Sequence, residues 1–455
     1  MEISFNMNNN QRKILLKSIK VIGFENNNDQ VLDIFICDQK ILKISKPNSI
    51  SISKSSEYSI YDCKNLILIP GLIDMKVHLN GSEVENINYI QKVAAKSGIL
   101  KLVSTPNKVT LLDNPLAIEH LYEKSKSKFM PEILSYGAAT KRLDGVQISE
   151  LGLMTESGVV GFSDGNHCIQ DSLVMRRIMS YAQMFNKPVI QHAEDRSLAG
   201  LAESSSTTIK GEVNESQIST RLGLIGIPSC AEVIIIERDL RLAKLTNAHY
   251  HVSNVSTKES IEVIKKGKEE GINITCDTSP PYFSLNELEV SNYDTAFKLS
   301  PPLRNEEDRK AVVKGIKDGI IDAISSNHQS RSNDTKLLPF SSSSVGASGL
   351  ETLLQLTFSL TTKGEISIQK AIDLVTKNPA KILNIDLPKI EENSEASFLI
   401  LDPEMSQIIN KDKLMTSPTP FNGIPVEVTN VATFIKGNLV FQETGFKARN
   451  NEQFN

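Results

Sequence analysis

Residues 66–79 read LILIPGLIDMKVHL. This near-continuous run of apolar residues is typical of a strand that is buried on both faces, as in a parallel sheet. The run ends on two polar side chains, Lys76 and His78. From there to residue 326, segments typical of strands alternate with segments typical of helices. About eight such units predict an α/β fold with a parallel (β/α)8 barrel, whose active site would lie at the carboxyl ends of the strands.

Short β-rich segments flank this region at both ends of the chain. We therefore predict a TIM-like barrel (residues 70–394) inserted into a small β-sandwich domain that is built from both termini (residues 1–69 and 395–455). Gly437-Asn438 is the predicted turn of a final hairpin. The predicted strands of the sandwich cover residues 14–22, 33–37, 40–44, 397–401, 430–435 and 439–441.

Composition and charge exclude several classes of protein. The 455 residues carry 50 Lys and Arg against 54 Asp and Glu, a net charge of −4, so no nucleic-acid footprint is expected. No apolar run reaches the roughly 18 residues that a membrane span needs. Residues 1–13 are rich in Asn and lack the apolar core of a signal peptide. The five cysteines form no CxxC pair, which is typical of reduced thiols in a cytoplasmic protein: Cys37, Cys63, Cys168, Cys230 and Cys276.

Polar residues recur where the predicted strands of the barrel end. Packing alone would not place His, Asp and Asn at one strand end after another. Because the carboxyl ends of barrel strands meet at one rim, these side chains predict a functional site there. They are Lys76-Val77-His78, Pro106-Asn107, Ser163-Asp164, His192, Asn254 and Asn327-His328.

Short motifs in a fixed order carry a resemblance to a known family. They are residues 70–75 (PGLIDM), 105–107 (TPN), 161–164 (GFSD), 189–195 (VIQHAED), 255–257 (VST), 301–304 (PPLR), 349–352 (GLET), 378–381 (NPAK) and 419–421 (TPF). Through them the chain resembles the dihydroorotase group of the amidohydrolase superfamily over nearly its whole length. The resemblance implies a hydrolase of pyrimidine biosynthesis, in which zinc activates the water that opens the cyclic amide of dihydroorotate.

The resemblance also implies a set of metal ligands, and this chain departs from it. His78, Asp164 and His192 stand at ligand positions. Lys76 replaces the first histidine of a His-x-His pair, and Asn254 replaces a further histidine ligand. A protonated lysine has no lone pair to give to a metal. We therefore interpret the three retained ligands as vestigial and expect no bound metal, or zinc if any metal binds.

Catalytic and substrate-contacting positions differ as well. Asn327 replaces the aspartate that the resemblance implies as general base, so we assign no catalytic residue. Arg331 replaces a histidine on the substrate side, and Asn80 replaces an arginine that grips the substrate carboxylate. Asn107 is kept, and it is the substrate-binding residue that we predict.

Two classes of function stay open. By resemblance, the chain is either a non-catalytic, structural or regulatory companion of aspartate carbamoyltransferase, or an active dihydroorotase or related cyclic amidase with a single-zinc site. The first class predicts that Lys76 and Asp164 form an ion pair, directly or through one water, in place of the metals. In both cases we expect a homo-oligomer that binds neither nucleic acid nor membrane.

Overall fold

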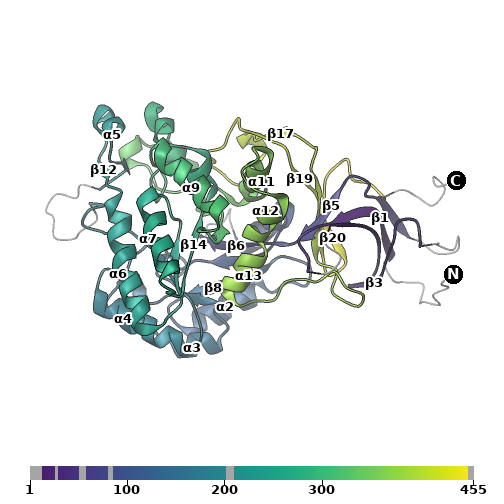
Figure 1. Ribbon diagram of the computed structural model, residues 1–455, viewed down its shortest axis with the longest axis horizontal. Helices are drawn as coiled ribbons and strands as arrows, with labels where there is room; N and C mark the ends of the chain where they lie inside the picture. Colours follow the sequence, from purple (N-terminus) through teal and green to yellow (C-terminus); the bar gives the residue numbers. More distant parts are fainter. Residues whose placement is uncertain (1–12, 26–28, 51–57, 80–85, 201–209, 449–455) are drawn as a thin grey trace.

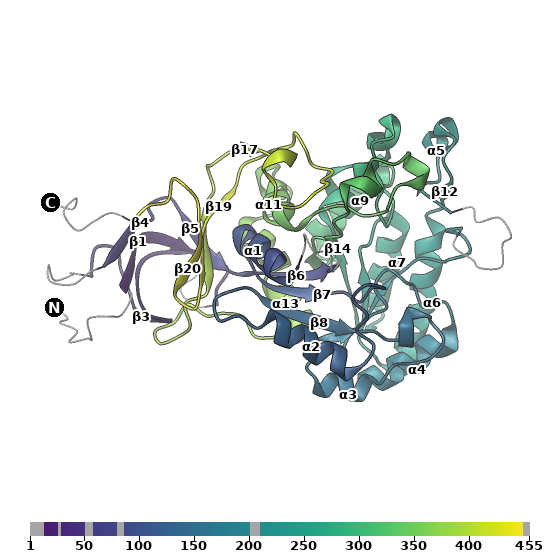
Figure 2. The same ribbon diagram turned by 180° about the vertical axis from the view of Figure 1, so that it is seen from behind.

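Two parts make up the computed structural model, which describes residues 13–25, 29–50, 58–79, 86–200 and 210–448. A β-sheet domain lies at one end of an elongated molecule, and a barrel surrounded by helices lies at the other (Figure 1). The view from behind shows the yellow strands of the carboxyl-terminal region beside the purple strands of the amino-terminal region (Figure 2). Segments far apart in the sequence therefore build one domain.

The sheet domain takes strands from both ends of the chain. The strand order is β20-β19-β16-β5-β1-β2-β3, and β4 pairs with β1. The antiparallel pair β5–β16 joins the two regions of the chain, which confirms the predicted β-sandwich domain built from both termini. The strands are β1 (Lys13–Val21), β2 (Gln30–Cys37), β3 (Lys40–Ser45), β4 (Ser59–Asp62), β5 (Ile67–Pro70), β16 (Phe398–Asp402), β19 (Thr429–Ile435) and β20 (Asn438–Gln442).

The final hairpin is present, but it turns one residue earlier than predicted. Ile435 pairs with Asn438, so Lys436 and Gly437 form a two-residue turn. Both residues have left-handed backbones, with φ of 49° and 71°, as a type I′ turn requires. A Cβ atom on Gly437 would lie 1.7 Å from the carbonyl oxygen of Asp38, so this position needs glycine.

The barrel contains eight strands whose order follows the sequence and whose neighbours are parallel. A hydrogen bond from the His78 N–H to the His328 carbonyl (2.9 Å) brings the end of the series back to its first strand. This closure confirms the predicted TIM-like barrel. The strands are β6 (Leu72–Val77), β7 (Ile99–Ser104), β8 (Glu132–Gly137), β9 (Gly161–Phe162), β10 (Val189–His192), β13 (Tyr250–Ser253), β14 (Ile274–Thr278) and β15 (Ala323–Ile324).

Helices cover the outside of the barrel (Figure 1). In α7, for example, the Thr257 side chain caps the first turn by accepting from the Ser260 N–H, and Ile261 and Ile264 are buried. The helices are α1 (Ile87–Ser97), α2 (Pro115–Ser125), α3 (Leu151–Glu156), α4 (Ser172–Gln183), α5 (Gln217–Leu222), α6 (Cys230–Thr246), α7 (Lys258–Glu269), α8 (Pro280–Ser284), α9 (Glu306–Asp318), α10 (Asn333–Lys336), α11 (Leu353–Thr362), α12 (Ile368–Val375) and α13 (Lys377–Leu383). Two short pairs, β11 (Val213–Asn214) with β12 (Gly226–Ile227) and β17 (Gln407–Ile408) with β18 (Pro425–Val426), complete the fold.

The stretch that predicted one strand over residues 66–79 forms two. Gly71 separates β5, which lies in the sheet domain, from β6, which opens the barrel. A Cβ atom on Gly71 would lie 2.2 Å from the Leu100 side chain, so the chain can pass here only as glycine. Both strands are buried along their whole length, and an apolar run therefore could not reveal the change of sheet.

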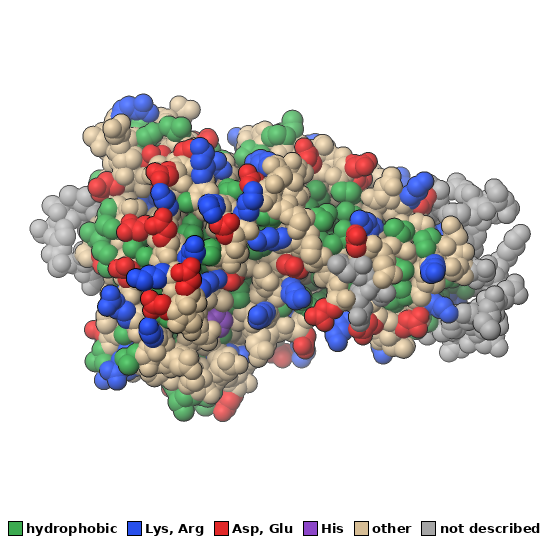
Figure 3. Space-filling model, in the orientation of Figure 1, with side chains coloured by type: hydrophobic (Ala, Val, Ile, Leu, Met, Phe, Trp, Pro, Cys, Tyr) green, Lys and Arg blue, Asp and Glu red, His purple; other side chains and the backbone are tan. Residues whose placement is uncertain are grey.

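The described helices include none with an apolar stretch that could cross a bilayer. Basic and acidic side chains are mixed over the helices of the face in Figure 3. Many of them pair on the surface, as Lys244 does with Glu270 (2.9 Å) and Lys258 with Glu307 (2.6 Å). Such exposed pairs add little to stability, because solvent screens them.

Candidate functional site

The carboxyl ends of the barrel strands bring the predicted site residues to one rim. All but Asn107 and Asn327 are at most 3% exposed, so most of the rim forms a buried polar layer rather than an open surface. The rim carries Lys76 at the end of β6 and His78 after it, Asp164 after β9, His192 at the end of β10, Asn254 after β13 and Asn327 after β15.

Lys76 is buried without a hydrogen-bond partner. Its Nζ forms no hydrogen bond within the described part of the chain. Burial lowers the pKa of Lys76 from 10.5 to about 8, and the carboxylates of Asp277 and Glu194 limit that drop. Lys76 and Asp164 therefore form no direct ion pair, and their predicted pairing through one water stays a prediction.

The carboxylate of Asp164 is hydrogen-bonded to Thr140 instead. Its carboxylate accepts hydrogen bonds from the Thr140 N–H (2.9 Å) and from the Thr140 hydroxyl. Burial raises the pKa of Asp164 to about 7, and the two hydrogen bonds from Thr140 oppose that rise. Thr140 follows β8, the strand next to β9. The hydrogen-bond donors of Asp164 therefore come from the neighbouring strand and not from the Lys76 ammonium on β6.

Two buried imidazoles lie near Lys76. Burial lowers the pKa of both His78 and His192 well below the usual value, and the Lys76 ammonium lowers both further. Both rings are therefore neutral at pH 7. His192 Nε2 shares a hydrogen bond with the Ser300 hydroxyl (3.0 Å), whereas neither ring nitrogen of His78 has a partner among the described residues.

The two asparagines on the rim share a backbone conformation. Asn254 and Asn327 are left-handed, with φ of 59° and 50°, which Asn tolerates better than most residues. The Asn254 Oδ1 accepts from the Ser279 hydroxyl (2.6 Å), and the Asn327 Nδ2 donates to the Ser300 carbonyl (3.2 Å). The other end of each amide has no partner within the described ranges. Neither amide can take up a proton as an imidazole or a carboxylate does.

Asn107, the predicted substrate-binding residue, is engaged by its own loop. Its Oδ1 accepts from the N–H groups of Val109 (2.8 Å) and Thr110 (2.9 Å), and its Nδ2 donates to the Leu79 carbonyl (3.2 Å). Asn side chains often build turns in this way. The amide therefore ties the loop after β7 to the residues after β6, and its role in substrate binding stays a prediction. Asn80, the other substrate position, lies outside the described residues.

Two buried carboxylates belong to the site although the sequence analysis assigns them no role. Asp277 on β14 accepts from the Asn254 N–H (2.6 Å), and its other oxygen lies 3.3 Å from His251 Nε2. Asp74 on β6 accepts from the Ser326 N–H (2.9 Å), and burial raises the pKa of Asp74 to about 6. An acid within a buried strand is the signal that could have identified both, because burying a carboxylate is costly unless it is paired.

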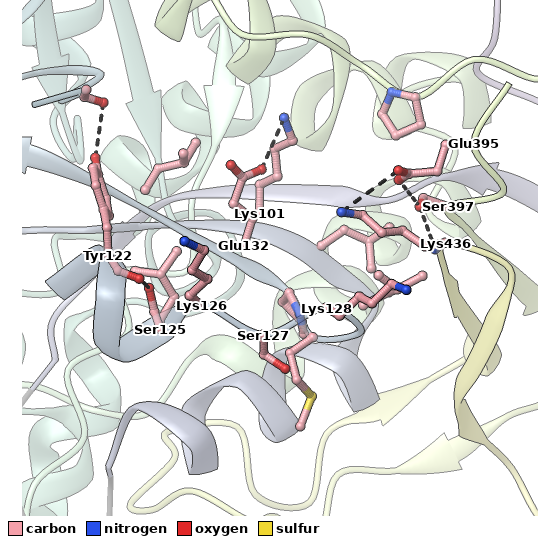
Figure 4. A pocket seen from close by; sticks show the side chains of 18 of the residues that line it. Lys101, Tyr122, Ser125, Lys126, Ser127, Lys128, Glu132, Glu395, Ser397 and Lys436 are labelled. Carbon is pink, nitrogen blue, oxygen red and sulfur yellow. Dashed lines mark hydrogen bonds and ion pairs between the residues drawn. The ribbon is translucent and has the colours of Figure 1, made fainter. Parts of the chain in front are cut away.

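A cleft of about 550 Å³ lies at the opposite end of the barrel, beside the sheet domain (Figure 4). Lys101 and Glu132, near the amino ends of β7 and β8, face each other there at 3.5 Å, and Lys436 lies 4.0 Å from Glu395. The residues that line this cleft include none of the predicted site residues. The candidate site is therefore the buried rim and not this cleft.

The sequence model described as "Amidohydrolase family" matches residues 67–440, which include every strand of the barrel. The chain belongs to the amidohydrolase family. Among relatives in this family, the dihydroorotase of Geobacter metallireducens is 36% identical over 434 residues, which cover 94% of this chain and 99% of the relative. The dihydroorotase of Desulforapulum autotrophicum is 35% identical over 386 residues, 84% of this chain and 88% of the relative. The resemblance to the dihydroorotase group is thus confirmed.

Solved structures of amidohydrolase enzymes share the fold of this chain. The L-hydantoinase (dihydropyrimidinase) from Arthrobacter aurescens superposes with a TM-score of 0.80 at 20% identity, over 95% of this chain and 97% of that one. The dihydropyrimidinase from Brevibacillus agri gives a TM-score of 0.78 at 21% identity, over 95% and 96% of the two chains. At such identities the likeness shows the fold alone.

The barrel mouth does not fit the zinc centre that the amidohydrolase resemblance implies. Across residues 13–25, 29–50, 58–79, 86–200 and 210–448, no three His, Cys, Asp or Glu side chains come together as a group that could hold a metal ion. Asp164 is bound by Thr140, and the Lys76 ammonium acts on both His78 and His192. A dication placed between these rings would be repelled by the lysine.

We predict that the purified protein contains less than about one zinc ion per two chains, because each ligand set is incomplete. Elemental analysis of the protein after dialysis checks this content. The variant Lys76→His removes the ammonium and restores an imidazole, so its zinc content should rise above that of the native chain. Two tightly held zinc ions in each native chain would contradict the prediction.

Proposed function

We propose that this chain is a non-catalytic, dihydroorotase-like protein of pyrimidine biosynthesis that acts as a structural or regulatory partner of aspartate carbamoyltransferase. The buried, unpartnered ammonium of Lys76 is the observation that carries the proposal. It lies near His78 and His192, the imidazoles that a metal-dependent hydrolase would use as ligands. The curated relatives named dihydroorotase support the place in pyrimidine biosynthesis.

The amide at position 327 supports the absence of catalysis. A general base contributes roughly 10²- to 10⁴-fold to a rate, and Asn327 cannot serve as one. The neighbouring carboxylates hold the backbone, since Asp74 accepts from the Ser326 N–H and Asp277 from the Asn254 N–H. The retained fold with an altered rim favours a role that depends on the surface of the molecule.

An activity assay separates this proposal from its alternative, an active single-zinc dihydroorotase or related cyclic amidase. We expect no measurable opening of dihydroorotate and no closure of carbamoyl aspartate, with or without added zinc. The matched variants are His192→Ala, which removes a retained ligand, and Lys101→Met, which changes the far end of the barrel. Turnover by the native chain that Lys101→Met keeps and His192→Ala abolishes would establish the alternative.

The partnership is tested by mixing the chain with the aspartate carbamoyltransferase encoded in the same genome. We expect the two proteins to co-elute in size-exclusion chromatography and the stoichiometry to be fixed when either one is in excess. Separate elution at micromolar concentrations of both would contradict the partnership. An intact dihydroorotase gene elsewhere in that genome would further support a non-catalytic role, whereas its absence would favour the alternative.

A further inference from the structure

Several buried nitrogen atoms at the barrel mouth lack hydrogen-bond partners. They include Lys76 Nζ, Asn254 Nδ2, both ring nitrogens of His78, and His192 Nδ1, none of which has a partner among the described residues. Each of these four side chains is at most 3% exposed. Buried polar groups are normally hydrogen-bonded, because burial removes their hydrogen bonds to water. We call these four side chains the donor cluster.

The members of the donor cluster lie close to one another. His192 ends β10 and is in register with Ser253 on β13, so Asn254 follows directly beside it. The ammonium of Lys76, from β6, acts electrostatically on both His78 and His192. One small group at the centre of the mouth can therefore approach several of these nitrogens.

The donor cluster offers mostly N–H groups. An ammonium carries three of them, an amide nitrogen two, and a neutral imidazole one. The unpartnered acceptors of the site are fewer, and they include Asn327 Oδ1, Asp74 Oδ2 and the ring nitrogen of neutral His78 that carries no hydrogen. Arg331 adds a second positive charge that acts on His78. The carboxylates of Asp277 and Glu194 also act on Lys76 and offset part of this positive charge. An apolar molecule would leave the donors unpaired, whereas the oxygens of an anion would accept hydrogen bonds from them.

Solvent is one side chain away from the donor cluster. The Ser300 hydroxyl is bonded to His192, and the Asn327 amide is bonded to the Ser300 carbonyl. Ser300 and Asn327 are both partly exposed, whereas His192 beneath them is buried. Ser300 and Asn327 therefore lie between the donor cluster and solvent.

We infer that the barrel mouth binds a small oxyanion, a carboxylate or a phosphate group, in contact with Lys76 and Asn254. The bound oxygens accept hydrogen bonds from the donor cluster and neutralise the lysine. The inference goes beyond the proposed function, because that function names no ligand for the barrel mouth. The inference rests on that function in one respect, because a zinc ion held by His78 and His192 would occupy the same space.

The test uses the full chain in a chloride buffer after treatment with EDTA, with its zinc content measured in the same sample. Orthophosphate and malonate are the probes, and sodium chloride at equal ionic strength is the control. We expect saturable heat in calorimetry and a rise in Tm for at least one probe, since a ligand of the native state stabilises it. Chloride should give neither.

Variants locate the site. Lys76→Met should weaken binding of the probe at least about tenfold, equivalent to about 1.4 kcal/mol. Asn254→Asp, which replaces an N–H donor by a negative charge, should weaken it in the same direction and tests a second member of the donor cluster independently. Lys101→Met, a lysine of the far cleft, should bind as the native chain does.

The outcomes are separable. Binding of phosphate alone identifies a phosphate or phosphate ester as the ligand, and binding of malonate alone identifies an organic acid; both support the inference. If zinc-free protein gives no saturable response, the inference is overturned and the proposed function is unaffected. The same holds if the protein responds but neither Lys76→Met nor Asn254→Asp changes the response. Zinc-dependent turnover of dihydroorotate in the untreated sample would instead contradict the proposed function.

Discussion

Replacing Lys76 with methionine is expected to make the protein more stable, by roughly 3 kcal/mol at pH 7. Burial lowers the pKa of this lysine from 10.5 to about 8, and each pKa unit corresponds to about 1.4 kcal/mol of preference for the neutral form. The folded protein therefore bears the cost of an ammonium group without a hydrogen-bond partner. Methionine has a similar length and no charge, so it removes this cost and keeps the packing.

The gain should depend on pH in a defined direction. The pKa of Lys76 is lower in the folded chain than in the unfolded chain, so between pH 8 and 10.5 the unfolded chain binds more protons at this residue. The contribution of Lys76 to stability therefore rises with pH across this window. The advantage of Lys76→Met should be complete below pH 8 and disappear by about pH 10.5.

Chemical denaturation at pH 7 and pH 10 in a buffer without phosphate or carboxylate measures both effects. Lys101→Met is the control, because Lys101 is partly exposed and already donates to the Asp386 carbonyl (3.2 Å). Its stability should change little, and by the same amount at both pH values. A loss of stability in Lys76→Met at pH 7 would mean that the lysine has a favourable partner, which would remove the basis of the prediction.

Replacing Arg304 with methionine should destabilise the protein by about 3–5 kcal/mol, as expected when one member of a buried charge network is removed. The guanidinium is buried and donates to the Ser256 hydroxyl (3.2 Å), to Asn214 Oδ1 (2.9 Å) and to the Ile227 carbonyl (3.0 Å). It also lies 3.9 Å from the buried carboxylate of Glu232. The Arg304 side chain thus connects four parts of the fold: β11, β12, α6 and the loop after β13.

The control for Arg304→Met is Arg309→Met. Arg309 is also bonded to a glutamate, since it contacts both oxygens of Glu306 (2.8 and 2.7 Å), but its side chain is about a quarter exposed. Solvent screens that pair, so its loss should cost about 1 kcal/mol or less. Thermal and denaturant unfolding of the two variants gives the comparison. Equal losses of unfolding free energy in the two variants would show that burial does not strengthen the interactions of Arg304.

The fold and the place of the site could be predicted because both depend on regular patterns. Alternating strand and helix segments predict the barrel, and polar residues at successive strand ends predict its functional rim. The partner of a particular side chain does not follow from such patterns. Lys76 and Asp164 stand on the same rim, but Thr140, one strand away from Asp164, offers it an N–H and a hydroxyl. Spacing fixes the strand end, whereas the direction of a long side chain depends on its packing.

The boundary at Gly71 was hidden for a different reason. Strands β5 and β6 are equally apolar, so hydrophobicity alone cannot show that they belong to different sheets. The steric demand of Leu100 on Gly71 is a contact between residues distant in sequence, which appears only in three dimensions. The same holds for Asp277, whose acceptance of the Asn254 N–H joins two neighbouring strands.

The sheet domain built from both ends of the chain has a consequence for how the protein emerges from the ribosome. Strand β5 emerges from the ribosome before the barrel strands. One of the strands that pairs with it, β16, is translated only after the whole barrel. Until then the nascent chain exposes an unpaired strand edge and the apolar face that later packs against Phe398 and Phe434. The barrel strands are therefore synthesised before β16, β19 and β20 can complete the sheet.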